Sequence, residues 1–207
     1  MTVPLKRWLV VGFALVAAFV ALGLGVARHP LTLDAQVASA LHGVYTRPLG
    51  RVAEIGSDIL GPVLPYVLGM ALLALALRHR QHAGLCVRLA VVLLLCRLTS
   101  LTAKPVFLRE RPRDYPDLSY PSGHVVSVAS TGFVLVLLCA WLWPRLVGRV
   151  AAAVAVATVL SAACRVVLGV HWVTDTIGAV LAVTGVGLLS ACALRLLPPG
   201  DGRSLDG

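Results

Sequence analysis

Long apolar runs dominate the chain, and short polar segments separate them. A helix needs about 20 apolar residues to cross the hydrocarbon core of a bilayer. Six runs approach or reach that length, and the second and third of them are the shortest: residues 8–27, 62–77, 85–101, 124–143, 150–168 and 172–194. Backbone polar groups find no water inside a bilayer, so such runs predict helices. We expect an all-helical integral membrane protein with six transmembrane helices in a bundle.

The connection between the first two runs has a different pattern. Its apolar residues recur at helical spacing and predict an amphipathic helix in the membrane interface: Leu33, Val37, Leu41, Val44 and Tyr45. Pro48 and Gly56 are expected to break this helix. We favour a packing role, in which the helix covers the bundle; the alternative is that it gates substrate entry.

We expect residues 1–207 to form one membrane-embedded domain, because no internal repeat stands out. The Pro/Gly-rich stretch 197–207 predicts a flexible tail. Lys6 and Arg7 precede the first apolar run as in a signal peptide, but that run is too long for one, so we interpret it as an uncleaved span. Aromatic residues near the predicted span ends are typical of an interfacial belt: Trp8, Tyr115, Tyr120, Trp141, Trp143 and Trp172.

Composition and charge refine this picture. The chain is 58% hydrophobic and 13% charged, which excludes an ordinary water-soluble globule. Its net charge of +9 does not indicate a nucleic-acid partner, because the basic residues follow the alternation of the spans. One side carries Lys6, Arg7, Arg78, Arg80, Arg145, Arg149, Arg195 and Arg203. By the positive-inside rule this side is cytoplasmic, and so are both termini.

The opposite, outer side is also rich in basic residues, which that rule does not explain. Three polar clusters fall there. The first is Lys104 with Arg111 and Pro112. Pro105, the residue after Lys104, is expected to end the third helix. The other two are Pro-Ser-Gly-His at 121–124, and Arg165 with His171 and Asp175. Unrelated loops that converge on one face indicate an active site.

The residue types indicate phosphate chemistry. Lys104, Arg111 and Arg165 suit a tetrahedral oxyanion. Ser122 and Gly123 open a helix, whose N-terminal amides and dipole favour an anion.

His171 and Asp175 share a helical face at i, i+4, so the carboxylate can orient the imidazole for nucleophilic attack. Gly169 marks the turn that lets Arg165 converge with them. His124 can serve as general acid and then as general base.

Each signal alone has a structural interpretation. Arginine-rich loops often only anchor lipid headgroups, a serine before a helix is often only a cap, and most i, i+4 His/Asp pairs are structural. Glu110, Asp114 and Asp117 favour ion pairing over metal binding. Five scattered cysteines, an odd number without CxxC spacing, indicate apolar packing. Arg97, two turns before Lys104, either lines the site or has a structural role.

The combined pattern resembles a known family. K-x6-RP (Lys104 to Pro112), PSGH (residues 121–124) and R-x5-H-x3-D (Arg165 to Asp175) look like the three-part signature of the type 2 phosphatidic acid phosphatase superfamily, in its bacterial membrane branch. The resemblance implies His171 as nucleophile, His124 as general acid, and a phosphate site formed by Lys104, Arg111, Ser122, Gly123 and Arg165. We predict no required metal or cofactor. One departure is Cys164, where the family usually has serine.

We therefore expect a lipid phosphatase in the bacterial plasma membrane, with its site on the outer face. It would remove a terminal phosphate from undecaprenyl diphosphate, phosphatidic acid or phosphatidylglycerol phosphate, and the motifs do not separate these substrates. The alternatives are a lipid phosphotransferase that uses the same phosphohistidine, and a non-enzymatic lipid carrier. The pattern does not predict an oligomeric state.

Overall fold

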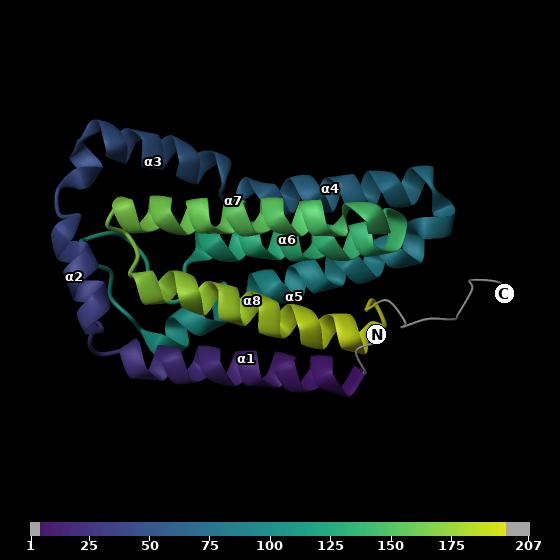
Figure 1. Ribbon diagram of the computed structural model, residues 1–207, viewed down its shortest axis with the longest axis horizontal. Coiled ribbons are helices and arrows are strands. Elements are labelled where there is room, and N and C mark those ends of the chain that lie inside the picture. Colours follow the sequence, from purple (N-terminus) through teal and green to yellow (C-terminus); the bar gives the residue numbers. More distant parts are fainter. Residues whose placement is uncertain (1–4, 198–207) are drawn as a thin grey trace.

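The computed structural model describes residues 5–197, which form a bundle of long helices lying side by side (Figure 1). The long helices are α1 (Leu5–Val26), α4 (Val63–Arg78), α5 (Ala83–Phe107), α6 (Gly123–Leu142), α7 (Val147–Val167) and α8 (Val173–Ala193). Six helical segments are long and apolar enough to span a membrane, and the second of them joins α3 (Pro48–Ile59) to α4. The expected six-span, all-helical membrane protein is confirmed. The predicted tail lies, apart from Leu197, outside the described residues.

Two boundaries differ from the sequence-based expectation. The third span was expected to be short, but α5 has 25 residues. Pro105 does not end α5, because the helix continues to Phe107 and stops where Leu108 adopts a left-handed backbone with φ of 50°. The turn after proline still forms, since Leu108 N donates to Lys104 O at 3.0 Å.

Close backbone contact joins the first and last spans. A Cβ atom added to Gly185 of α8 would lie 3.1 Å from Gly12 O and 3.0 Å from Val16 N, both on α1. Small residues allow transmembrane helices to approach this closely. The α1 helix therefore packs along α8, as Figure 1 shows.

The segment between the first two spans is more broken than expected. It forms α2 (Thr32–Ala40), which lies across one end of the bundle, and then α3 (Figure 1). Pro48 begins α3 and does not break a helix there, because the first residue of a helix needs no N–H for helical hydrogen bonding. Gly56 lies inside α3 and does not break it. A Cβ atom added to Gly56 would lie only 3.0 Å from Cys164 Sγ. Leu33, expected on the packed face, is exposed, and the buried residue of α2 is Asp34.

Tyr120 is a core residue and not part of an interfacial belt. It is fully buried, its ring stacks on Phe19 at 5.3 Å between centroids, and its hydroxyl donates to Phe19 O at 2.7 Å. The ring of Phe107 meets it edge-on. The segment leading into α6 is therefore fastened to α1. All five cysteines are free thiols, and four of them are buried.

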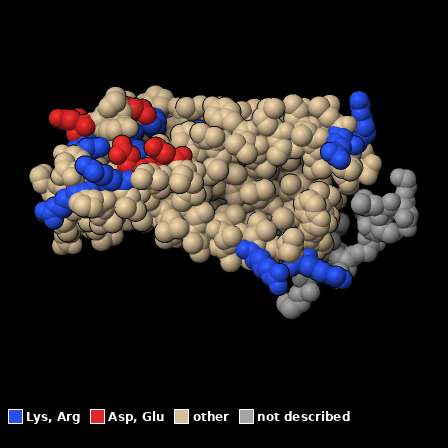
Figure 2. Space-filling model, turned by 90° about the horizontal axis from the view of Figure 1, so that it is seen from above, with Lys and Arg blue, Asp and Glu red and all other residues tan. Residues whose placement is uncertain are grey.

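On the face shown in Figure 2, charged side chains gather at the two ends of the elongated molecule, and the middle carries almost none. Acidic residues appear only at the end where α2 lies, together with basic ones; the opposite end shows only basic residues near the described chain. The six apolar segments therefore form a belt between two charged ends.

Candidate active site

Four helix ends supply the site residues. Lys104 lies in the last turn of α5, His124 in the first turn of α6, Arg165 in the last turn of α7 and Asp175 in the first turn of α8. These ends all fall on the side of the bundle covered by α2 (Figure 1). The structure thus brings the three predicted clusters to one end. Gly169, with φ of +66°, makes the expected turn between Arg165 and His171.

The geometry around His171 defines its tautomer. Its Nδ1 lies 3.3 Å from Asp175 Oδ2, and its Nε2 lies 3.2 Å from Arg111 Nη1. A guanidinium only donates hydrogen bonds, so Nε2 accepts and the ring proton sits on Nδ1. The side chain is buried, and burial lowers the pKa of His171 to about 4 against the opposing effect of Asp175. The ring is therefore neutral, with the Nε2 lone pair directed at Arg111.

The carboxylate of Asp117 lies between the basic residues of the first cluster. It forms an ion pair with Lys104 and lies 3.7 Å from Arg111 Nη2, which confirms the ion pairing expected for Asp117. Burial raises the pKa of Asp117, but hydrogen bonds from Lys104 and Leu118 outweigh it and lower the pKa overall. Lys104 and Arg111 thus hold an anionic group in this structure.

Two buried polar atoms in the predicted phosphate site have no hydrogen-bond partner among the described residues. They are Ser122 Oγ and Arg165 Nε. Arg165 is otherwise anchored, because its Nη1 donates to Ser57 Oγ at 3.0 Å. Ser122 N donates to Asp175 O at 3.2 Å, which ties the start of α6 to the start of α8. Both residues keep hydrogen-bonding capacity for an anion.

His124 lies at the start of α6, beside the link between α3 and α4. A Cβ on Gly61 would lie 3.4 Å from its Cδ2 atom, and the charge of Arg165 acts on its ring. Arg97 braces the same turn by donating to Gly123 O at 3.1 Å and to Ser127 Oγ at 2.6 Å. Of the two interpretations of Arg97, these contacts favour the structural one.

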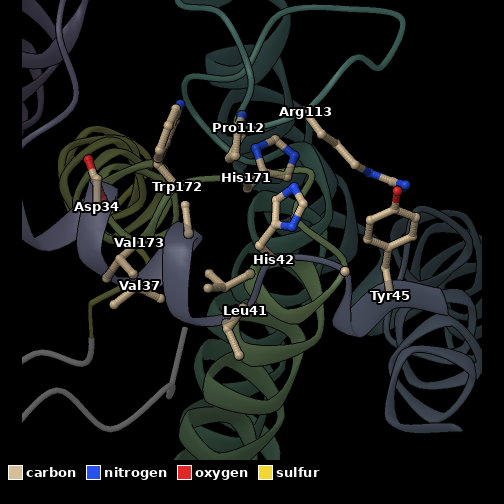
Figure 3. A pocket seen from close by; sticks show the side chains of 14 residues that line it. Asp34, Val37, Leu41, His42, Tyr45, Pro112, Arg113, His171, Trp172 and Val173 are labelled. Carbon is tan, nitrogen blue, oxygen red and sulfur yellow. The ribbon is translucent and has the colours of Figure 1, made fainter. Parts of the chain in front are cut away.

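A cavity of about 110 Å³ adjoins His171 (Figure 3). Its walls come from α2, from the turn at residues 169–173 and from the loop after α5. His42, a residue outside the three predicted clusters, lines the cavity with His171. Arg113 also lines it and lies over the ring of Tyr45 at 4.2 Å. The helix that covers the bundle therefore forms one wall of this cavity, which His171 lines but the predicted phosphate-binding residues do not.

Sequence reasoning missed several buried polar residues around Asp175. Arg109 is not one of the predicted site residues, yet it is buried and donates to Asp175 and Asp34. Ser119 also donates to Asp175. The available signal was Asp34, which is the one charged residue of α2. Its partners are 75 and 140 positions away in sequence, so local spacing does not reveal them.

Comparisons with known proteins agree with this architecture. An undecaprenyl-diphosphatase of Sulfolobus acidocaldarius is 39% identical over 87 residues, a match that spans 42% of this chain and 37% of that protein's length. The crystal structure of a transmembrane PAP2 type phosphatidylglycerolphosphate phosphatase from Bacillus subtilis superposes with a TM-score of 0.66 at 22% identity, over 89% of this chain and 94% of that one. That likeness is one of fold. Residues 81–197 match the sequence profile of the PAP2 superfamily, and the chain therefore belongs to this superfamily.

Proposed function

We propose that the protein is an integral-membrane lipid phosphatase that hydrolyses a terminal phosphate through a phosphohistidine at His171. The observation that carries this proposal is the position of the neutral imidazole. Asp175 holds one nitrogen, and the lone pair of the other faces a cationic group of the first motif. The names of the two relatives make undecaprenyl diphosphate and phosphatidylglycerol phosphate the first substrates to test.

In the first step, His171 Nε2 attacks phosphorus, and the bond from phosphorus to the lipid oxygen breaks. His124, in its protonated form, donates a proton to that oxygen. The phosphoryl oxygens would bind Lys104, Arg111 and Arg165, with Ser122 Oγ and the Gly123 amide supplying further donors. Such preorganised donors stabilise the charge of a loose phosphoryl transition state. Arg111 has to exchange its contact with Nε2 for the phosphate.

In the second step, His124 acts as a base. It takes a proton from water as the water oxygen attacks phosphorus, the bond from phosphorus to His171 Nε2 breaks, and inorganic phosphate leaves. The proton stays on His171 Nδ1 throughout, where it is hydrogen-bonded to the Asp175 carboxylate. This hydrogen bond stabilises the ring while it carries the phosphoryl group. Every charge in this cycle is supplied by a side chain, so we expect no metal requirement.

The apolar belt and the polar ends support a substrate that stays in the membrane. Its hydrocarbon chain would remain beside the helices while its headgroup reaches the end covered by α2. The basic residues at the opposite end support a cytoplasmic location for that end. The contact of α1 with α8 supports a single domain, in which the first and last spans fold together.

Phosphate release in detergent tests the activity. The purified protein is given undecaprenyl diphosphate, phosphatidic acid or phosphatidylglycerol phosphate with a chelator present. We expect turnover of at least one lipid, and loss of about 1,000-fold or more in His171→Asn and His124→Asn. Activity that persists in His171→Asn, or that the chelator abolishes, contradicts the mechanism. Phosphorylated acceptor in place of free phosphate identifies a transferase, and no chemistry with any lipid favours a carrier.

Cysteine labelling of intact cells tests the orientation. In a cysteine-free background, Asp114→Cys places a thiol in the exposed loop at the site end, and Arg80→Cys places one at the other end. An impermeant maleimide should label Asp114→Cys directly and Arg80→Cys only after permeabilisation. The reverse result places the site in the cytoplasm.

A further inference from the structure

A buried chain of charged groups runs from α2 to the proposed catalytic carboxylate. Arg109 Nη2 donates to Asp34 Oδ2 at 2.7 Å, and Arg109 Nη1 donates to Asp175 Oδ1 at 2.6 Å. The three side chains are at most 2% exposed. They come from α2, from the loop after α5 and from α8, so these contacts depend on the assembled fold.

Arg109 determines which oxygen of Asp175 faces His171. It occupies Oδ1, while Oδ2 accepts hydrogen bonds from Trp172 N at 2.8 Å and from Ser119 Oγ, and lies 3.3 Å from His171 Nδ1. A carboxylate held at both oxygens cannot rotate without breaking buried hydrogen bonds, which is costly. The imidazole therefore meets an acceptor of fixed direction.

Asp34 holds the same turn of α8 by a second route. Its Oδ1 accepts from Thr174 N at 3.0 Å, and its Oδ2 accepts from Thr174 Oγ1 at 2.5 Å. The amide of Thr174 belongs to the first turn of α8, whose N–H groups lack partners within the helix. Asp34 thus caps in trans the helix turn that carries Asp175.

The charge balance gives Asp34 a further effect. Arg109 alone would neutralise Asp175, and a neutralised carboxylate attracts an imidazole proton weakly. With Asp34 present, two carboxylates share the Arg109 guanidinium, so this group of three side chains carries a net negative charge on the Nδ1 side of His171, while Arg111 lies at Nε2. A buried net charge is costly unless it is compensated. The positive charge that develops on the ring during phosphorylation supplies that compensation.

We propose that Asp34 and Arg109 are positioning residues, which act through Asp175 to hold His171 in its Nδ1–H tautomer and to stabilise the phosphorylated ring. The catalytic consequence rests on the proposed function; the effect on the tautomer does not. The role also gives the covering helix α2 a part in catalysis, because α2 carries Asp34.

Nitrogen NMR of histidine-labelled protein in detergent micelles tests the effect on the ring. His171→Asn identifies the His171 signals. The wild type should show the Nδ1–H tautomer, and Asp34→Asn should raise the fraction of the Nε2–H form. Arg109→Lys, which keeps the buried charge but cannot bridge two carboxylates, should do the same. The matched control is Asp58→Asn, which removes an exposed carboxylate of α3 at the same end and should change nothing.

Kinetics on the same variants test the catalytic consequence. We expect kcat to fall about 10- to 100-fold in Asp34→Asn and Arg109→Lys, the range typical of groups that orient a functional histidine. KM should change less than about twofold, because neither residue is placed to contact the phosphate. Thermal denaturation checks that each variant is folded. If only one of the two variants folds, that variant is sufficient for the test.

The possible failures are distinguishable. If both variants match Asp58→Asn in tautomer and in kcat, the inference is wrong although the phosphatase stands. If the wild type releases no phosphate from any lipid while the variants still shift the tautomer, the proposed function is wrong and the coupling stands. A rise in KM alone, with kcat and the tautomer unchanged, would show a purely structural role and contradict the inference.

Discussion

At the scale of single residues, His171 shows how burial and two neighbours select a reactive form. The carboxylate of Asp175 holds the proton on Nδ1, and Arg111 contacts the lone pair of Nε2. Burial opposes protonation of the whole ring. The motif spacing predicted the pairing of His171 with Asp175. It did not predict Arg109 or Asp34, because a buried charge chain depends on segments that only the fold brings together.

The titration of His171 is the first residue-scale prediction. Its pKa of about 4 in the fold lies below the ordinary 6.5, so the ring stays neutral and nucleophilic at neutral pH. The unfolded chain binds this proton more readily, so His171 should weaken folding as pH falls from about 6.5 towards 4. Histidine NMR against pH, with His171→Asn for assignment, should give a midpoint near pH 4. A midpoint at pH 6 or above contradicts the burial argument.

A second prediction concerns the internal anion at Lys104 and Arg111. In the proposed mechanism, a substrate phosphate would displace the Asp117 carboxylate from both cations. In Asp117→Asn we expect KM, and the inhibition constant of inorganic phosphate, to fall about two- to fivefold, in line with the energy of a partly exposed ion pair. The control Asp114→Asn removes another exposed carboxylate from the same loop. An unchanged or higher KM in Asp117→Asn, relative to this control, rejects the competition.

At the scale of elements, apolar run length predicted the number and order of the spans, and local chemistry set their ends. Pro105 was misleading because its missing N–H removes one helical hydrogen bond without ending the helix: Leu108 N still donates to Lys104 O, and α5 continues to Phe107. Gly56 was misleading because it serves contact with Cys164 and does not break α3. The apolar spacing around α2 predicted a covering helix, but its buried contact is the carboxylate of Asp34, which hydrophobic periodicity cannot detect.

Close packing of α1 on α8 gives an element-scale prediction. In Gly185→Val, the new side chain would meet the backbone of Gly12 and Val16 and push the two helices apart. We expect a loss of about 1–3 kcal/mol of stability, as for other overpacked sites, seen as a lower melting temperature in detergent. Gly69→Val is the matched control, because a Cβ at Gly69 of α4 meets nothing within 4 Å. Equal melting temperatures for the two variants would contradict the close contact.

At the scale of the whole molecule, the alternation of six spans explains why three distant motifs share one end. The sequence pattern was sufficient for that conclusion, since successive spans cross the membrane in opposite directions. Charge then separates the two ends: acidic and basic residues gather around the site, and only basic residues mark the other described end (Figure 2). Residues that contact the site without belonging to a predicted motif, such as Asp34 and Arg109, come from the segments between spans, whose placement depends on tertiary contacts.

The central claim is that His171 carries the phosphoryl group during turnover. Rapid acid-free quenching of the protein with a lipid labelled on its terminal phosphate, followed by peptide mapping, tests it most directly. The account predicts alkali-stable, acid-labile label on the peptide that contains His171, and none in His171→Asn. Label on another residue, or full turnover without any labelled protein in rapid-quench experiments, would contradict it.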